Sequence, residues 1–151
     1  MMNLESLSPA AAHWPRQQYE GFFATTSSQA PTERLVWVVE DESGDWSEKS
    51  AGEECEILGF LVAHRVDAEW ELENIVVAGR ARRRGLATLL LRALIAQVRA
   101  KQGKSIFLEV RESNRSARAL YQKVGFEEEG LRKSYYASPP EDAILCRLSF
   151  Y

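Results

Sequence analysis

The stretch RARRRGLAT, residues 80–88, carries four arginines in its first five positions and turns apolar after Gly85. The segment before it, WELENIVVA (70–78), first alternates and then becomes fully apolar, as a central strand does. Beyond Gly85, apolar residues recur at the spacing of one helix face, at positions 87, 90, 91, 94 and 98. The stretch is therefore predicted to be a basic loop between a strand and the N-terminus of a helix.

Such a loop is suited to binding an anion. The first turn of a helix has N–H groups without intrahelical partners and the positive end of the helix dipole, and a pyrophosphate fits there. Glycine allows close approach of the backbone, and arginines add charge. A GxGxxG fingerprint and a P-loop are both absent, which argues against a nicotinamide or nucleoside-triphosphate enzyme. The residues expected to contact phosphates are Arg82, Arg83, Arg84, Gly85, Leu86, Ala87 and Thr88.

The composition indicates one ordinary domain over residues 1–151. The net charge of −3 and the lack of aromatic residues among the arginines argue against direct nucleic-acid binding through this loop. No apolar run is long enough to cross a membrane, and the first residues do not resemble a signal peptide, so we expect a cytoplasmic protein. Two cysteines without a CxxC spacing and two histidines predict no metal site.

The remaining segments predict a mixed architecture. Strands are predicted at 34–40, 57–66, 70–78, 105–110, 126–136 and 143–151, and helices in pieces over 8–25, from about 85 to 100 and over 114–125. Lys101 and Gly103 are predicted to end the long helix, and Asn114 to cap the next one. An acidic loop is expected at 41–56 and a turn at 137–143. The order implies an α/β or α+β fold with a mixed sheet.

Three stretches, taken in order, resemble the Gcn5-related N-acetyltransferase (GNAT) family. RRRGLA (82–87) matches the family's Q/R-x-x-G-x-G/A loop, and it is followed by LEVRESNRSARALYQKVGF (108–126) and by RKSYY with EDAILCRL near the end. The resemblance covers residues 70–148 and is most similar to the ribosomal-protein-alanine N-acetyltransferase (RimI) branch. It implies a mostly antiparallel mixed sheet with helices on both faces. The short N-terminal part implies that the family's first strand is missing, which would leave a sheet edge unpaired.

The resemblance also implies a donor and its contacts. In the family the basic loop binds the pyrophosphate of acetyl-CoA, used as co-substrate without a metal, and the preceding strand positions the thioester. The matching strand residues here are Ile75, Val76 and Val77. Backbone N–H groups there can polarise a carbonyl without any special side chain. The asparagine that matches Asn114 contacts the cofactor in the family, which is compatible with helix capping.

Three glutamates are candidates for the general base. The resemblance assigns proton acceptance to Glu109, in LEVRESN. Glu71 and Glu73 are alternatives, because they alternate on one face of strand 70–78 and other branches of the family take their base from that strand. A route through water alone also remains open, as does the reading of Glu71 and Glu73 as ordinary solvent-facing residues.

Tyr121 is the candidate acid, which would protonate the departing thiolate if it lay within hydrogen-bond reach. The pattern by itself favours a core aromatic on an apolar helix face, and the match to the family's LYxxxGF favours the catalytic role. The resemblance places Tyr135 and Tyr136 near the acceptor, although both are also ordinary strand aromatics.

The expected reaction is direct acetyl transfer to a peptide or protein N-terminal amine, such as the N-terminal alanine of a ribosomal protein. An α-amino group, with a pKa of about 7.7–8.0, is far more often neutral at pH 7.5 than lysine at about 10.4. Acetylation of a small amine or a lysine side chain, and a non-catalytic acyl-CoA-binding module, are the alternatives. The protein is expected to be a monomer or a homodimer.

Overall fold

The computed structural model describes residues 33–41 and 56–151. The helical pieces predicted within 8–25 and most of the acidic loop predicted at 41–56 lie outside these residues. The expected missing first strand likewise concerns residues before 33. Within the described part, none of the helices is long and apolar enough to cross a membrane.

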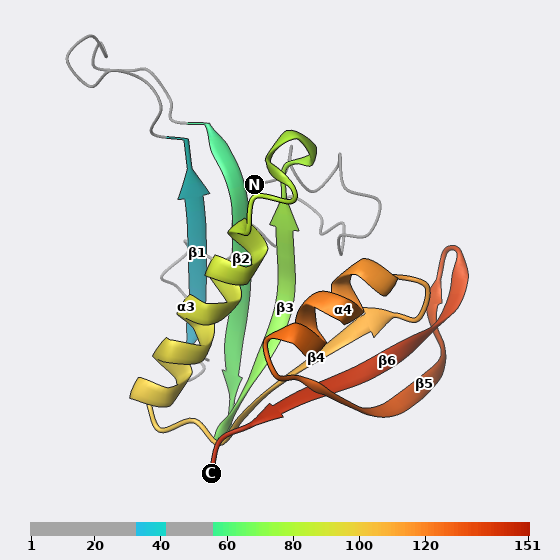
Figure 1. The fold of residues 1–151 in the computed structure, drawn as a ribbon. Coiled ribbons are helices and arrows are strands. Elements are labelled where there is room, and N and C mark those ends of the chain that lie inside the picture. Colours follow the sequence, from blue (N-terminus) through green and yellow to red (C-terminus); the bar gives the residue numbers. More distant parts are fainter. Residues whose placement is uncertain (1–32, 42–55) are drawn as a thin grey trace, which may run out of the picture.

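Six strands form one sheet in the described residues, and every strand predicted from the sequence is present (Figure 1). The strands are β1 (Arg34–Glu40), β2 (Ile57–Val66), β3 (Glu69–Val77), β4 (Ser105–Arg111), β5 (Glu127–Ala137) and β6 (Pro140–Ser149). Their order across the sheet is β1-β2-β3-β4-β6-β5. Among the described strands only β3 and β4 run parallel, so the predicted mixed and mostly antiparallel sheet is confirmed.

The sheet opens between its two parallel strands. β3 and β4 pair only at three positions, from Glu69 opposite Ser105 to Glu71 opposite Phe107, and then diverge (Figure 1). A bulge in the β2–β3 pairing, between Val62 and Ala63, falls where the divergence starts. Bulges bend a strand and increase its twist, which directs the end of β3 away from β4.

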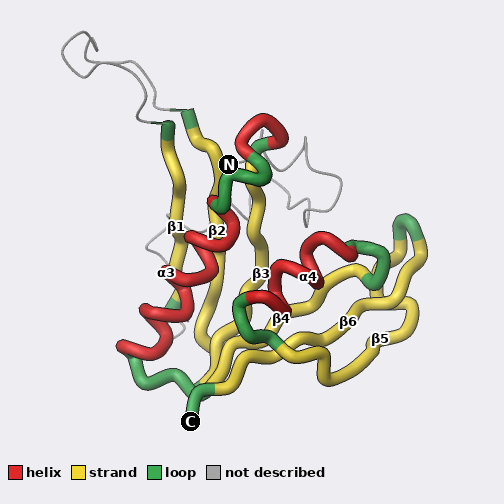
Figure 2. Tube along the Cα trace, viewed as in Figure 1, coloured by secondary structure: helices red, strands yellow, loops and turns green. Residues whose placement is uncertain are grey.

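Two helices cover one face of this sheet, which we call the helix face (Figure 2). They are α3 (Leu86–Ala100) and α4 (Arg115–Lys123), and a short 3₁₀ helix, η1 (Gly79–Ala81), precedes α3. Side chains from both helices and the sheet form one buried cluster, which includes Trp70, Leu72, Leu91, Leu94, Leu108, Tyr121 and Cys146. The α3 residues are the ones whose helical spacing predicted a buried face.

The helix α3 ends as predicted, with Lys101 as its last capping residue and Gly103 two residues later. The left-handed residue is Gln102, with φ 56°, and Gly103 follows it. The Gln102 and Gly103 N–H groups donate to the carbonyls of Arg99 and Val98 at 3.0 and 2.9 Å, which completes the helix cap. Glycine is needed at 103 for space, because a Cβ there would lie 2.5 Å from a Val98 methyl carbon.

The loop between the last two strands is shorter than the sequence predicted. β5 continues to Ala137 and β6 already begins at Pro140, so only Ser138 and Pro139 form the turn expected over 137–143. The proline and acidic residues that suggested a loop lie at the start of β6. Proline is tolerated at the first position of a strand, which explains the difference.

Candidate active site

The open end of β3 presents backbone donors towards the diverging β4. The Ala78 N–H donates to the Leu58 carbonyl of β2 at 2.8 Å. Because amides alternate along a strand, the N–H groups of Ile75 and Val77 point to the other side, where β4 has diverged. The Val76 amide points towards β2, so the strand positions suggested by the sequence separate into two that face the opening and one that does not.

The basic loop leads directly from this strand end to the N-terminus of α3. Arg83 and Gly85 both adopt left-handed backbone conformations, with φ of 63° and 81°. Gly85 is the residue before the helix, and its carbonyl accepts from the Leu89 N–H at 3.0 Å. The N–H groups of residues 86–88 therefore precede the first intrahelical hydrogen bond, and they lie at the positive end of a 15-residue helix.

The four arginines of the loop have different surroundings. Arg80 forms ion pairs with Glu56 and Asp41, so its charge is directed towards the ends of β1 and β2. Arg82 donates through Nε to the Val77 carbonyl at 3.2 Å, which fixes the loop against the end of β3. Arg83 and Arg84 are exposed beside the α3 N-terminus. Arg80 and Arg82 thus hold the loop in place, and Arg83 and Arg84 face solvent at the predicted anion site.

Asn114 caps α4, as predicted. Its side-chain oxygen accepts from the Ala117 N–H at 3.2 Å and from the Ser116 hydroxyl at 3.1 Å. The contact with a cofactor that the family resemblance implies for this residue remains a prediction.

The sheet face opposite the helices carries the three candidate bases, and we call it the acidic face. Arg34 donates to both Glu73 carboxylate oxygens, at 3.0 and 2.8 Å. His64 lies between two carboxylates, with Nε2 3.6 Å from Glu71 and Nδ1 3.4 Å from Glu73. The pKa of Glu71 is raised, first by burial and then by the neighbouring charges of Glu73 and Glu109, with His64 and Arg34 acting in the opposite direction.

Glu109 lies on β4, two residues beyond the last position that pairs with β3. Its carboxylate accepts from an Arg132 guanidinium N–H at 2.5 Å. Tyr135 also interacts with it, and the Glu109 carboxylate is the main cause that raises the pKa of Tyr135 to about 12. The Arg132 guanidinium carbon lies 4.3 Å from the centre of the Tyr135 ring. Arg132 and Tyr135 thus hold one glutamate at the edge of the opening.

Tyr121 lies on the helix face, on the opposite side of the sheet from Glu109. It is 7% exposed and its ring packs 5.8 Å from that of Phe126. Burial is the main cause that raises the pKa of its phenol, so the hydroxyl stays protonated at neutral pH. Tyr136 interacts electrostatically with both Tyr121 and Glu109. It contributes to the raised pKa of Tyr121, and burial and the Glu109 charge raise the pKa of Tyr136.

Sequence reasoning did not single out Arg132, Arg111 and His64. Arg111 could have been found, because it alternates with Phe107 and Glu109 on one face of a strand whose other residues are apolar. Arg132 could not, since its place beside Glu109 depends on an irregular register between Arg132 and Tyr136 in β5. His64 gives no pattern of its own, and only the β2–β3 register brings it to Glu71.

A strand that diverges from its parallel neighbour and runs through a basic loop into a helix defines a class of protein. The model of the acetyltransferase (GNAT) family matches residues 8–126, and the chain belongs to this family. A curated relative is the [ribosomal protein bS18]-alanine N-acetyltransferase of Haemophilus influenzae, 44% identical over 96 residues. The match covers 62% of this chain and 65% of that relative's length.

Solved structures agree with the fold. The ribosomal-protein-S18-alanine N-acetyltransferase from Escherichia coli superposes with a TM-score of 0.72 at 27% identity, over 98% of this chain and 84% of that one. A putative streptothricin acetyltransferase from Bacillus anthracis, solved in complex with acetyl coenzyme A, gives a TM-score of 0.65 at 22% identity. That match covers 81% of this chain and 65% of the other, and it supports the fold alone.

Proposed function

We propose that this protein is an N-acetyltransferase that moves the acetyl group of acetyl-CoA to a protein N-terminal amine, with the N-terminal alanine of ribosomal protein bS18 as the preferred acceptor. The observation that carries the proposal is the divergence of β3 from β4 directly before the basic loop and the N-terminus of α3. Family membership and the names of the relatives support the chemistry and the acceptor. The proposal places the enzyme in the cytoplasm, where ribosomal proteins are made.

The donor binds at the open end of β3. Its diphosphate accepts hydrogen bonds from the N–H groups of residues 85–88, and Arg83 and Arg84 add positive charge. The thioester carbonyl faces the N–H groups of Ile75 and Val77, which already point into the opening. Donors fixed in a strand stabilise charge that develops on a carbonyl oxygen without reorganising during the reaction.

The acceptor amine approaches from the acidic face. Its nitrogen attacks the thioester carbon, the new C–N bond forms, and the C–S bond breaks. We assign proton acceptance to Glu109, because it lies beyond the last paired residue of β4, at the edge of the opening, whereas Glu71 lies within the paired segment. Glu71 and Glu73 lie on the same face, held by His64 and Arg34, and Tyr135 and Tyr136 line the same side.

The departing thiolate takes its proton from Tyr121 on the helix face. The two faces of the sheet thus divide the reaction: the base contacts the acceptor on one side, and the acid contacts the leaving group on the other. This division is possible only where β3 and β4 are apart, because a continuous sheet would separate Glu109 from Tyr121. In this proposal Tyr121 serves both packing in the buried cluster and proton donation.

An N-terminal amine suits this site because it needs little activation. At pH 7.5 roughly a third of α-amino groups are neutral, against about one lysine in a thousand, from reference pKa values of about 7.7–8.0 and 10.4. A single carboxylate without a metal or a covalent intermediate therefore suffices for the α-amine.

The proposal is tested by measuring thiol release from acetyl-CoA with matched acceptors. They are the N-terminal peptide of bS18 starting with alanine, the same peptide with a blocked terminus and an internal lysine, and the polyamine spermidine. We expect release with the first peptide only, and mass spectrometry should place the acetyl group on the α-nitrogen. Faster release with spermidine or with the blocked peptide would contradict the proposed acceptor, and no release with any of the three would contradict an acetyltransferase of amines.

A further inference from the structure

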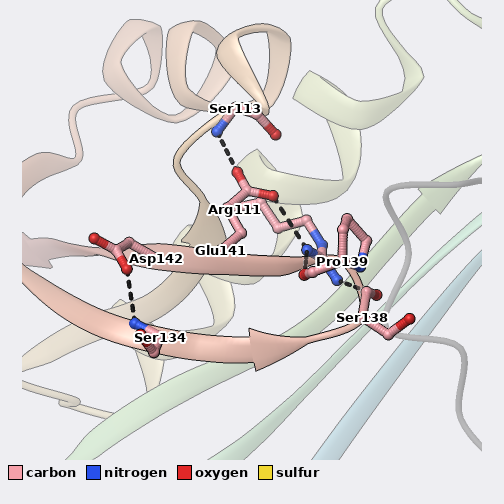
Figure 3. A network of polar contacts seen from close by, with 7 residues as sticks. All are labelled: Arg111, Ser113, Ser134, Ser138, Pro139, Glu141 and Asp142. Carbon is pink, nitrogen blue, oxygen red and sulfur yellow. Dashed lines mark hydrogen bonds and ion pairs between the residues drawn. The ribbon is translucent and has the colours of Figure 1, made fainter.

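The tip of the β5–β6 hairpin is held to β4 by one arginine. Arg111 donates to the carbonyls of Ser138 and Pro139, each at 3.2 Å (Figure 3). Its guanidinium carbon also lies 4.0 Å from the centre of the Tyr136 ring. Arg111 stands on the same face of β4 as Glu109, two residues further along. β4 thus carries both the assigned base, Glu109, and the arginine that binds the hairpin of Tyr135 and Tyr136.

Glu141 anchors this arginine to the loop before α4. One carboxylate oxygen accepts from Arg111 at 3.1 Å, and the other accepts from the Ser113 N–H at 2.6 Å (Figure 3). Ser113 directly precedes Asn114, whose side chain caps α4. The hairpin, the end of β4 and the start of α4 are therefore joined through a single carboxylate.

A second polar contact fixes the irregular part of the same hairpin. The Asp142 carboxylate accepts from the Ser134 N–H at 2.7 Å (Figure 3). Ser134 has a φ of 51°, within the register shift between Arg132 and Tyr136. This bond satisfies an amide that the irregular strand cannot pair, directly before Tyr135.

The contacts of Arg111 differ from those of a freely exposed ion pair. The side chains of Arg111 and Glu141 are only 20% and 16% exposed, and each makes more than one hydrogen bond. Charge-assisted hydrogen bonds to several partners give geometric specificity as well as energy. The Ser113 contact is also the main cause that lowers the pKa of Glu141, so the carboxylate is ionised at neutral pH.

We propose that Arg111 and Glu141 are positioning residues that hold the Tyr135–Tyr136 hairpin beside Glu109 and so shape the acceptor side of the opening. This inference rests on the proposed function, because the acceptor site is the one described there. The donor contacts at residues 75–77 and 85–88 lie outside the network. Asn114, the other predicted donor contact, follows Ser113 directly, but its side chain is held by its own bonds to Ala117 and Ser116. We call the contacts of Arg111 and Glu141 the clamp. Its loss is therefore expected to weaken binding of the acceptor and not of acetyl-CoA.

The experiment measures kcat and both KM values with the alanine peptide. Glu141→Gln and Arg111→Met should raise the acceptor KM about tenfold, as expected for loss of a multiply bonded ion pair, with the KM for acetyl-CoA within about twofold. Arg111→Lys keeps the charge but not the stacking or both carbonyl contacts, so its acceptor KM should lie between those of Arg111→Met and the unaltered protein. Glu112→Gln is the matched control, since that exposed side chain is outside the network.

Amide hydrogen exchange gives a readout that does not depend on activity. In Glu141→Gln, the amides of residues 134–138 should exchange faster than in Glu112→Gln, while those of β2 and α3 remain unchanged. Equal exchange in the two variants, or equal increases in the KM values of donor and acceptor, would overturn the inference. Inactivity of the unaltered protein would count against the proposed function instead, and the exchange comparison would still decide whether the clamp exists.

Discussion

Two glutamates on the acidic face differ in what surrounds them. Glu109 is held by a guanidinium and a phenol at the edge of the opening, whereas Glu71 lies against His64 within the paired segment. Burial and neighbouring carboxylates keep the pKa of Glu71 above its ordinary value. The base is assigned to Glu109 because of its position at the opening.

Replacement of Glu109 should remove the base. Glu109→Gln is expected to lower kcat/KM about 100-fold at pH 7, within the usual range for a general base. The defect should become smaller as the pH rises, because more of the acceptor amine is then neutral without help. The measurement is the pH profile of kcat/KM for the alanine peptide. A larger loss in Glu71→Gln than in Glu109→Gln would move the base to β3.

The raised pKa of Glu71 should also make the stability of the protein depend on pH. A carboxyl whose pKa is raised by folding stabilises the folded state below its unfolded pKa, and this contribution is lost as the pH rises through the folded value. Because the pKa of Glu71 is raised, Glu71→Gln is expected to increase the Tm at pH 8. The difference should disappear near pH 3, where the carboxyl is almost fully protonated in both states, since an unfolded glutamate has a pKa of about 4.3. A Tm difference of the same size at both pH values would show that the shift is not responsible.

The substitution Tyr121→Phe distinguishes a packing role of this residue from a catalytic one. Tyr121→Phe keeps the ring in the buried cluster and removes only the hydroxyl, so the Tm should change little. The value of kcat should fall about 100-fold, as for loss of a general acid. Tyr151→Phe provides the matched control, since Tyr151 is fully exposed at the last residue. An unchanged kcat in Tyr121→Phe would return this residue to a purely structural role.

At the scale of elements, α3 depends on one glycine for its entry. Gly85 has a φ of 81°, and a Cβ there would meet nothing within 4 Å, so the requirement for glycine is conformational and not steric. An alanine in that conformation costs about 1 kcal/mol or more, and the loop can relieve the strain only by moving the N–H groups of residues 86–88.

Gly85→Ala is therefore expected to raise the KM for acetyl-CoA about tenfold, because about 1–2 kcal/mol of strain is relieved by displacing the donor site. The acceptor KM should stay nearly constant. Gly79→Ala is the control, because a Cβ at that position also meets nothing within 4 Å and its φ is not in the left-handed region. Steady-state kinetics with each substrate varied in turn measures both values. A rise in the acceptor KM alone would show that the loop contacts the acceptor and not acetyl-CoA.

At the scale of the whole molecule, local sequence patterns predicted the helices and strands, whereas they did not predict the geometry of the site. The spacing of Leu90, Leu91 and Leu94 predicted the buried face of α3, and Asn114 predicted the start of α4, because both signals act within one element. The divergence of β3 from β4 and the place of Arg132 beside Glu109 depend on pairing and bulges between distant segments. No local pattern encodes such register, so the opening was not predicted from the sequence, and the roles of Glu109 and Tyr121 were expected only by resemblance to a family.

The most direct test of the account is a crystal structure of the protein with acetyl-CoA bound. We predict that the diphosphate lies within hydrogen-bond distance of the N–H groups of residues 85–88, and that the thioester carbonyl oxygen lies within such distance of the Ile75 or Val77 N–H. A diphosphate bound elsewhere, or a thioester that does not enter the opening between β3 and β4, would contradict it.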